Sequence, residues 1–243
     1  VRKRPGMYIG SVSTKGLNHL IYEIVDNSVD EFLAGYCDEI TVSLNKDGTA
    51  TITDNGRGIR VGFNERTGKT AVEMVFTMLH AGGKFGDGGY KISGGLHGVG
   101  ASVVNALSTW LTVTVKQGGK IYQQRYERGK IITPLEVIGT CRKSDTGTNV
   151  QFLPDPEIFD KTYFKAAMVR NRLHETAYLN PKLTIHYVNE REGEETTVDY
   201  HEPEGICAYV KKLNEGKQML HEPVYFKRMI DGIEAEVAFQ YTE

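Results

Sequence analysis

The chain has 243 residues, enough for one large domain or two small ones, and its 40% apolar and 25% charged residues are typical of globular proteins. Its formal net charge of −2 excludes an overall basic field for nucleic acid and leaves only a local basic patch open. The three cysteines are odd in number and far apart, which argues against a disulfide framework and a cysteine metal site. We therefore expect a cytoplasmic protein, without a membrane span or signal peptide.

The first part of the chain is predicted to contain a long helix and a hairpin. The apolar spacing of LNHLIYEIVDNSVDEFLAG (17–35) predicts an amphipathic helix that ends at Gly35. EITVSL (39–44) and TATIT (49–53) flank NKDG, a hairpin signal, and the second strand continues into DNGRG. AVEMVFTMLHA (71–81) predicts a second amphipathic helix.

A glycine-rich segment follows this second helix. Nine of the twenty residues from 81 to 100 are glycine, and loops this long are usually lids or disordered segments. The segment runs directly into a third predicted helix, ASVVNALS (101–108). Glycines at the start of a helix let an anion approach the unpaired backbone N–H groups, so phosphate binding is one interpretation and an ordinary flexible loop is the other.

Strands dominate the rest of the chain. LTVTVK (111–116), KIYQQRY (120–126) and TGTNVQFLP (146–154) are predicted strands, and residues 161–179 are a predicted helix. LTIHYV and TTVDY form another expected hairpin, and HEPEG (201–205) is typical of a linker. The pattern predicts an α+β fold, with a helix layer on a mixed, mostly antiparallel sheet. We expect one domain over 1–201 and a truncated second one over 202–243, because the chain stops inside a predicted strand.

The polar face of the first helix is a candidate site. His19, Glu23, Asp26, Asn27 and Asp30 lie within one arc, and no Lys or Arg occurs between Leu17 and Asn45. A solvated acidic face is the ordinary explanation, but such faces usually mix charges. Uncompensated oxygen donors suit Mg²⁺, which needs few protein ligands when phosphates supply the others. The His19–Glu23 pair suits a general base held by a second group.

Asp54 is a second candidate. Strand alternation places it on the same side of the sheet as Ile52, where a carboxylate is costly unless donors surround it. A turn-forming Asp in DNGRG is an equally ordinary interpretation.

Two stretches resemble known nucleotide-binding motifs but do not match them. GFNERTGKT (62–70) has five residues between its glycines where a P-loop has four, and GLHGVG (95–100) has the wrong glycine order for a dinucleotide fingerprint.

Taken together, the motifs resemble those of a known family. EIVDNSVDE, DNGRGI, GGLHGVG and TGTNVQF resemble the four ATP-site motifs of the GHKL (Bergerat-fold) ATPases. VRKRPGMYIG, HAGGKF, the stretch 90–108 and EVAFQY narrow the resemblance to the B subunits of bacterial type II topoisomerases, from end to end of the chain. The alternatives are an ATP-driven clamp of a chaperone or mismatch-repair protein, and a nucleotide-binding regulator without a catalytic base.

The resemblance implies roles for individual residues. Glu23 corresponds to the general base, His19 to its orienting partner, and Asn27 to the Mg²⁺ ligand. Asp54 corresponds to the acceptor of the adenine amino group, supported by the Thr148 hydroxyl. Ile59, Val75 and Phe76 correspond to apolar walls. The other implied ATP-binding positions are Gly58, Lys84, Tyr90, Lys91, Gly95, Leu96, His97, Gly98, Val99 and Gly100.

The resemblance also implies partners: ATP and Mg²⁺, the topoisomerase A subunit, DNA in the holoenzyme, a second copy in an ATP-dependent homodimer, and ATP-competitive inhibitors. It does not distinguish gyrase from topoisomerase IV. Arg60 stands where the family usually has proline, and Gln117 stands where many members have arginine. The family's affinity for its inhibitors therefore does not carry over directly to this chain. The family's catalytic lysine comes from the next domain and its swapped arm from residues before Val1, so neither belongs to this chain.

Overall fold

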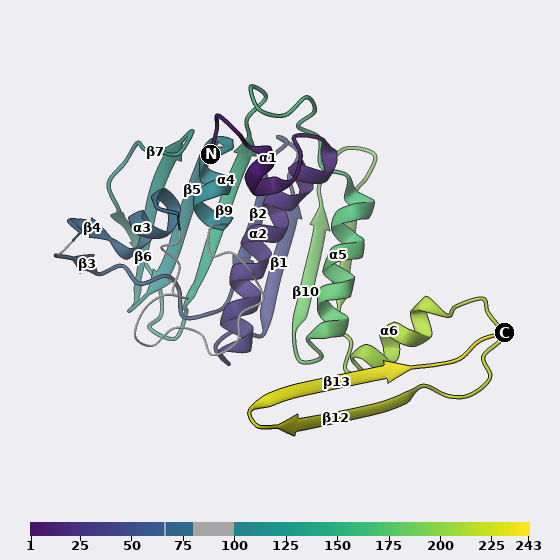
Figure 1. Ribbon diagram of the computed structural model, residues 1–243. Coiled ribbons are helices and arrows are strands. Elements are labelled where there is room, and N and C mark those ends of the chain that lie inside the picture. Colours follow the sequence, from purple (N-terminus) through teal and green to yellow (C-terminus); the bar gives the residue numbers. More distant parts are fainter. Residues whose placement is uncertain (66, 80–99) are drawn as a thin grey trace.

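The computed structural model describes residues 1–65, 67–79 and 100–243. A nine-stranded sheet forms the body of the molecule, in the order β11-β10-β1-β2-β9-β5-β6-β7 with β8 paired to β6 (Figure 1). Among the described strands of this sheet, β1 and β10 pair in parallel and all other pairs are antiparallel. The strands are β1 (Glu39–Leu44), β2 (Ala50–Asp54), β5 (Ser108–Gln117), β6 (Lys120–Glu127), β7 (Lys130–Ile131), β8 (Glu136–Thr140), β9 (Gly147–Pro154), β10 (Thr184–Asn189) and β11 (Thr196–Tyr200).

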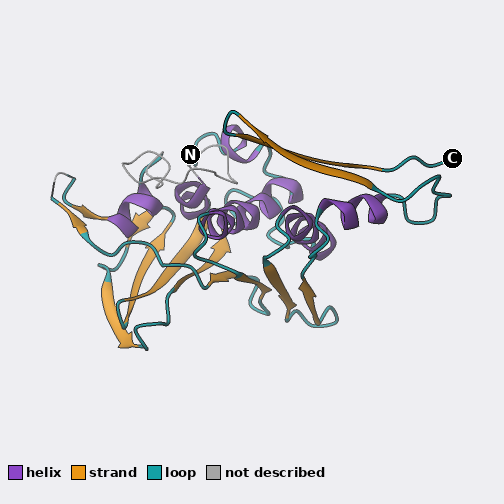
Figure 2. Cartoon of the chain, turned by 90° about the horizontal axis from the view of Figure 1, so that it is seen from below, coloured by secondary structure: helices purple, strands orange, loops and turns teal. Residues whose placement is uncertain are grey.

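The helices cover one face of this sheet, as Figure 2 shows. They are α1 (Gly6–Ile9), α2 (Thr14–Leu33), α3 (Ala71–Thr77), α4 (Gly100–Ala106) and α5 (Ala166–Leu179). The apolar stripe predicted for the first helix is confirmed, because Ile21, Val25 and Val29 of α2 are buried in the core against the sheet. Burial of this stripe stabilises the helix more than its intrinsic propensity does. The predicted α+β class and mixed sheet are confirmed.

The predicted helices all have different ends in the structure. The helix predicted over 17–35 is Thr14–Leu33 and the one predicted over 101–108 is Gly100–Ala106, where β5 already begins at Ser108; the other two differ at one end for an identifiable reason. The helix predicted over 71–81 ends at Thr77, because Asn105 Nδ2 of α4 donates to the Phe76 carbonyl (2.8 Å) and Met78 is extended. The helix predicted over 161–179 begins only at Ala166, and the Asn18 side chain of α2 accepts the backbone N–H of Lys165 (3.1 Å). In both cases a side chain distant in sequence bonds the backbone at the helix end.

The remaining elements lie outside the main sheet. A short ribbon joins β3 (Phe63–Asn64) to β4 (Lys69–Thr70), and after Gly205 come α6 (Ile206–Leu213) and a hairpin of β12 (Val224–Ile230) and β13 (Ile233–Phe239). This hairpin extends away from the sheet (Figure 1). It exposes large apolar side chains such as Phe226, Met229 and Ile233. None of the helices in the described ranges has the length and hydrophobicity that a membrane crossing requires.

Candidate functional site

The Glu23 carboxylate lies where α2 meets the start of α4. His19 Nε2 is 2.8 Å from Glu23 Oε1, one helical turn along α2, so the imidazole fixes one carboxylate oxygen. The other oxygen faces Gly100, where a Cβ would lie only 2.2 Å from Glu23 Oε2. The Glu23 side chain keeps 22% of its surface exposed, so water can reach it. The geometry is that of a carboxylate oriented by histidine beside a helix N-terminus.

Asp54, at the end of β2, is a buried carboxylate surrounded by donors. It is 9% exposed; Ser28 Oγ of α2 donates to Oδ2 (2.8 Å), and the backbone N–H groups of Gly56 (3.0 Å) and Thr148 (3.3 Å) donate to Oδ1. Burial raises the pKa of Asp54, and the three donors oppose the rise without cancelling it. The alternation that predicted an inward carboxylate is confirmed, and the Gly56 bond shows that Asp54 also organises the turn.

Asp54 retains acceptor capacity for a ligand. A carboxylate offers about four lone-pair sites, and three are used by Ser28, Gly56 and Thr148. Thr148 stands directly opposite Asp54 in the β2–β9 register, so its side chain belongs to the same end of the sheet. Ile59 and Val75 are half-buried against the core, whereas Phe76 is 1% exposed and packs on the Tyr126 ring (5.7 Å between centroids).

The loop after Asp54 is held by contacts that the sequence motifs did not reveal. Arg57 pairs with Glu31 of α2 (Nη2–Oε1 2.9 Å) and lies 3.7 Å above the Tyr36 ring centroid. Gln117 Nε2 donates to the carbonyls of Arg57 (3.3 Å) and Gly58 (3.5 Å). The position of Arg57 inside DNGRG indicates that the residue belongs to the loop, but nothing local in the sequence identifies its partner Glu31, which is 26 residues away.

Gly58 fits this loop because of its backbone. Its φ is +79°, and a Cβ would lie 2.9 Å from the Lys116 carbonyl oxygen, so a larger residue would be strained and would clash. Of the two positions where the chain differs from the usual residue of the family, Gln117 contacts this loop directly, whereas the Arg60 side chain is exposed.

The remaining acidic residues of α2 do not form a solvated cluster. Asp30 is 2% exposed, and burial raises the pKa of Asp26 to about 6, with Arg172 of α5 opposing the rise. Asn27 is exposed. Within the described ranges, no three His, Cys, Asp or Glu side chains are placed to hold a metal ion. An Mg²⁺ ion here would need phosphate oxygens in addition to Asn27.

The structure thus brings several predicted residues into two groups beside α2. One group consists of His19, Glu23 and Gly100; the other consists of Asp54, Thr148 and the Gly58 loop, tied to the helix by Ser28 and Glu31. The sequence motifs did not single out Ser28, whose buried hydroxyl bonds Asp54 in the structure. The predicted positions Lys84, Tyr90, Lys91, Gly95, Leu96, His97, Gly98 and Val99 lie outside the described residues.

This chain is similar to several known proteins. Residues 13–158 match the family of histidine kinase-, DNA gyrase B- and HSP90-like ATPases. The whole chain is 54% identical to the DNA gyrase B subunit of Thermotoga maritima and 50% identical to the DNA topoisomerase 4 B subunit of Streptococcus pneumoniae, covering 39% and 37% of their lengths. The chain therefore spans about two fifths of these relatives.

A solved structure is similar over the entire chain. The crystal structure of the 43K ATPase domain of Thermus thermophilus gyrase B in complex with an aminocoumarin matches with a TM-score of 0.88 and 41% identity. The match covers 100% of this chain and 62% of that one.

Proposed function

We propose that the two groups of residues beside α2 bind the two ends of ATP, because the chain belongs to the histidine kinase-, DNA gyrase B- and HSP90-like ATPases. Within that family it is the ATPase domain of a type II topoisomerase B subunit. The observation that carries the proposal is the pair of differently placed carboxylates. Asp54 is buried among donors, and Glu23 is water-accessible and held by His19. A buried hydrogen-bond acceptor can recognise the edge of a nucleobase, and an oriented, water-accessible carboxylate can take a proton from water.

At the adenine end, the remaining acceptor site of Asp54 receives the adenine amino group. The Thr148 hydroxyl supports this contact through water, and Gly58 and Ile59 lie against the base. Guanine would present a carbonyl to the Asp54 carboxylate, so the same geometry selects adenine over guanine.

At the phosphate end, Glu23 takes a proton from the attacking water while His19 holds its carboxylate in place. Asn27, one turn after Glu23 and exposed, provides the protein oxygen for Mg²⁺, which neutralises phosphate charge when bound. The family resemblance assigns the amides of 95–100 and the lysines Lys84 and Lys91 to the phosphates and Tyr90 to the base; of these residues the structure describes only Gly100. Phosphoryl transfer depends mainly on positioning and charge, so the site does not require a P-loop, and the lysine that the family takes from its next domain would add further charge.

In the whole enzyme, ATP brings two such domains together and gates the passage of DNA, with the A subunit as partner, in the bacterial cytoplasm. Residues 1–201 form the ATP-binding domain, and residues 202–243, which include the β12–β13 hairpin with its exposed apolar side chains, belong to the next domain. Ligands that fill the adenine end compete with ATP. Negative supercoiling of DNA by the full-length enzyme would mark it as a gyrase rather than a topoisomerase IV.

Glu23→Gln tests the catalytic assignment. The variant keeps the shape of the side chain but cannot accept the proton, so hydrolysis should fall about 10²–10⁴-fold while ATP affinity stays nearly unchanged. The measurements are ATP turnover in a dimer-competent, full-length enzyme and ATP titration by calorimetry. Glu136→Gln, an exposed change on β8, is the matched control. Turnover at the control's rate would remove Glu23 from the role of base.

A further inference from the structure

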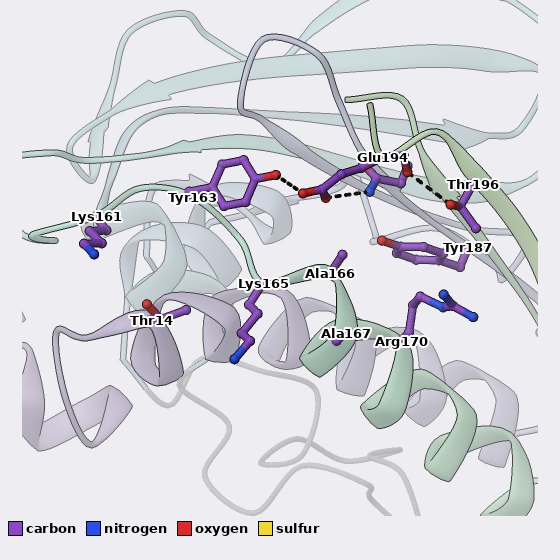
Figure 3. Close-up of a pocket in the computed structure, with 11 residues that line it drawn as sticks. Thr14, Lys161, Tyr163, Lys165, Ala166, Ala167, Arg170, Tyr187, Glu194 and Thr196 are labelled. Carbon is purple, nitrogen blue, oxygen red and sulfur yellow. Dashed lines mark hydrogen bonds between the residues drawn. The ribbon is translucent and has the colours of Figure 1, made fainter. Parts of the chain in front are cut away.

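A cavity of about 600 Å³ lies apart from the residues assigned to ATP (Figure 3). Its walls come from Thr14 at the start of α2, the segment 161–170, and residues of β10 and β11 with the turn between them. None of the candidate ATP-site residues lines it. Its volume falls in the range of small-molecule sites, about 300–1,000 Å³.

The charge of this cavity is unbalanced. Lys161, Lys165 and Arg170 line it, and none of the three has a carboxylate within 4.0 Å among the residues that the structure describes. The one carboxylate in the lining, Glu194, is already neutralised by Arg191 (Nη2–Oε2 2.7 Å) and also accepts the Tyr163 hydroxyl. The cavity therefore presents excess positive charge at its wall.

A buried hydroxyl in the same wall lacks a partner. Tyr187 of β10 is 0% exposed, and its hydroxyl has no hydrogen-bond partner in the described part of the chain. Figure 3 shows the Tyr187 hydroxyl directed toward the cavity, above Ala166 and Arg170. Buried hydroxyls are almost always bonded, because an unsatisfied one loses its bonds to water without compensation. Because the hydroxyl is fully covered, an acceptor atom in the cavity would satisfy this donor after a small shift of the side chains that cover it.

Arg170 supplies positive charge to the same wall of the cavity. Its Nε donates to Tyr200 Oη (3.2 Å), which fixes the guanidinium and leaves the terminal nitrogens as further donors. Ala166, Ala167 and the Tyr163 ring add apolar surface. We propose that this cavity binds a small organic anion, with a phosphate or carboxylate group that accepts from Tyr187 and Arg170 and an apolar part against the alanines.

The test uses phenyl phosphate and benzoate as probes and benzyl alcohol as a neutral control. Methyl NMR of Ala166 and Ala167 reports on the cavity, and a non-hydrolysable ATP analogue with Mg²⁺ keeps the probes out of the ATP site. A saturable shift with either anion and none with benzyl alcohol is expected, and the anion that binds more tightly identifies the group. No shift at millimolar concentrations, or equal shifts with benzyl alcohol, would overturn the proposal.

Two variants separate a ligand site from a structural role. Arg170→Gln and Tyr187→Phe should each weaken probe binding about fivefold or more, since each removes a bond to a charged group. Lys182→Gln removes an exposed charge outside the cavity and should leave binding unchanged. Without probe, Tyr187→Phe should melt at the same or a higher temperature, because it removes an unpaired hydroxyl. A lower melting temperature would show that ordered water already satisfies the hydroxyl, and would contradict the proposal.

Discussion

At the scale of single residues, burial of Asp54 bears directly on its proposed recognition of adenine. Replacing it with asparagine keeps its size but gives up one acceptor oxygen and turns an NH₂ group toward the donors of Ser28, Gly56 or Thr148. Asp54→Asn should therefore weaken ATP binding about tenfold or more, while the exposed Asp160→Asn control leaves it unchanged. Calorimetric titration with ATP and GTP measures this. Equal affinities of the unmodified chain for the two nucleotides would contradict the assignment.

Asp26 makes a different contribution, to the pH dependence of stability. Burial raises its pKa in the folded protein to about 6 from 3.8, so the protonated form favours folding and this stabilisation is lost as pH rises from about 4 to about 6. The difference amounts to at most about 3 kcal/mol.

Asp26→Asn should remove this component of the pH dependence. Its free energy of unfolding, measured by urea denaturation at intervals between pH 4 and pH 6, should fall less with pH than that of the unmodified chain. Parallel curves for the two proteins would show that Asp26 titrates normally.

At the scale of elements, α2 connects both ends of the site, and Gly100 fixes the distance between α2 and α4. A Cβ at position 100 would press on the Glu23 carboxylate, with contacts of 2.2 Å to Oε2 and 3.0 Å to Cβ. Gly100→Ala should therefore displace Glu23 from His19 and reduce ATP hydrolysis at least about tenfold with a much smaller loss of ATP affinity. Gly62→Ala, where a Cβ meets nothing within 4 Å, is the control. Wild-type turnover in Gly100→Ala would show that the two helices have room to separate.

The sequence predicted the elements better than it predicted their ends. Period-two alternation identified β1, β2 and β5, and the i, i+4 spacing identified the His19–Glu23 pair, because both depend only on local geometry. The end of α3 and the start of α5 depend on Asn105 and Asn18, which are distant in sequence.

The same distinction applies to the site. Alternation showed that Asp54 faces inward, but no local pattern could show that Ser28 donates to it or that Glu31 holds Arg57, since these partners meet only after folding. The family motifs supplied the roles of Asn27 and Thr148, which periodicity alone would have left as ordinary polar residues.

For the molecule as a whole, the proposed ATP site runs along α2, between the end of β2 and the start of α4. The β12–β13 hairpin lies below the end of α5, next to α6 (Figure 1), and the cationic cavity lies at the opposite end of α2 from Leu33, beside Thr14 (Figure 3). One helix thus carries the proposed general base, the proposed metal ligand and the Ser28 donor to Asp54.

The most direct test of the proposed ATP site is a crystal structure of the chain with a non-hydrolysable ATP analogue and Mg²⁺. We expect the adenine amino nitrogen within hydrogen-bond distance of an Asp54 carboxylate oxygen, Asn27 at the metal, and the terminal phosphate beside Glu23 and Gly100. An adenine bound away from Asp54, or a terminal phosphate out of reach of a water held by Glu23, would contradict the proposed site.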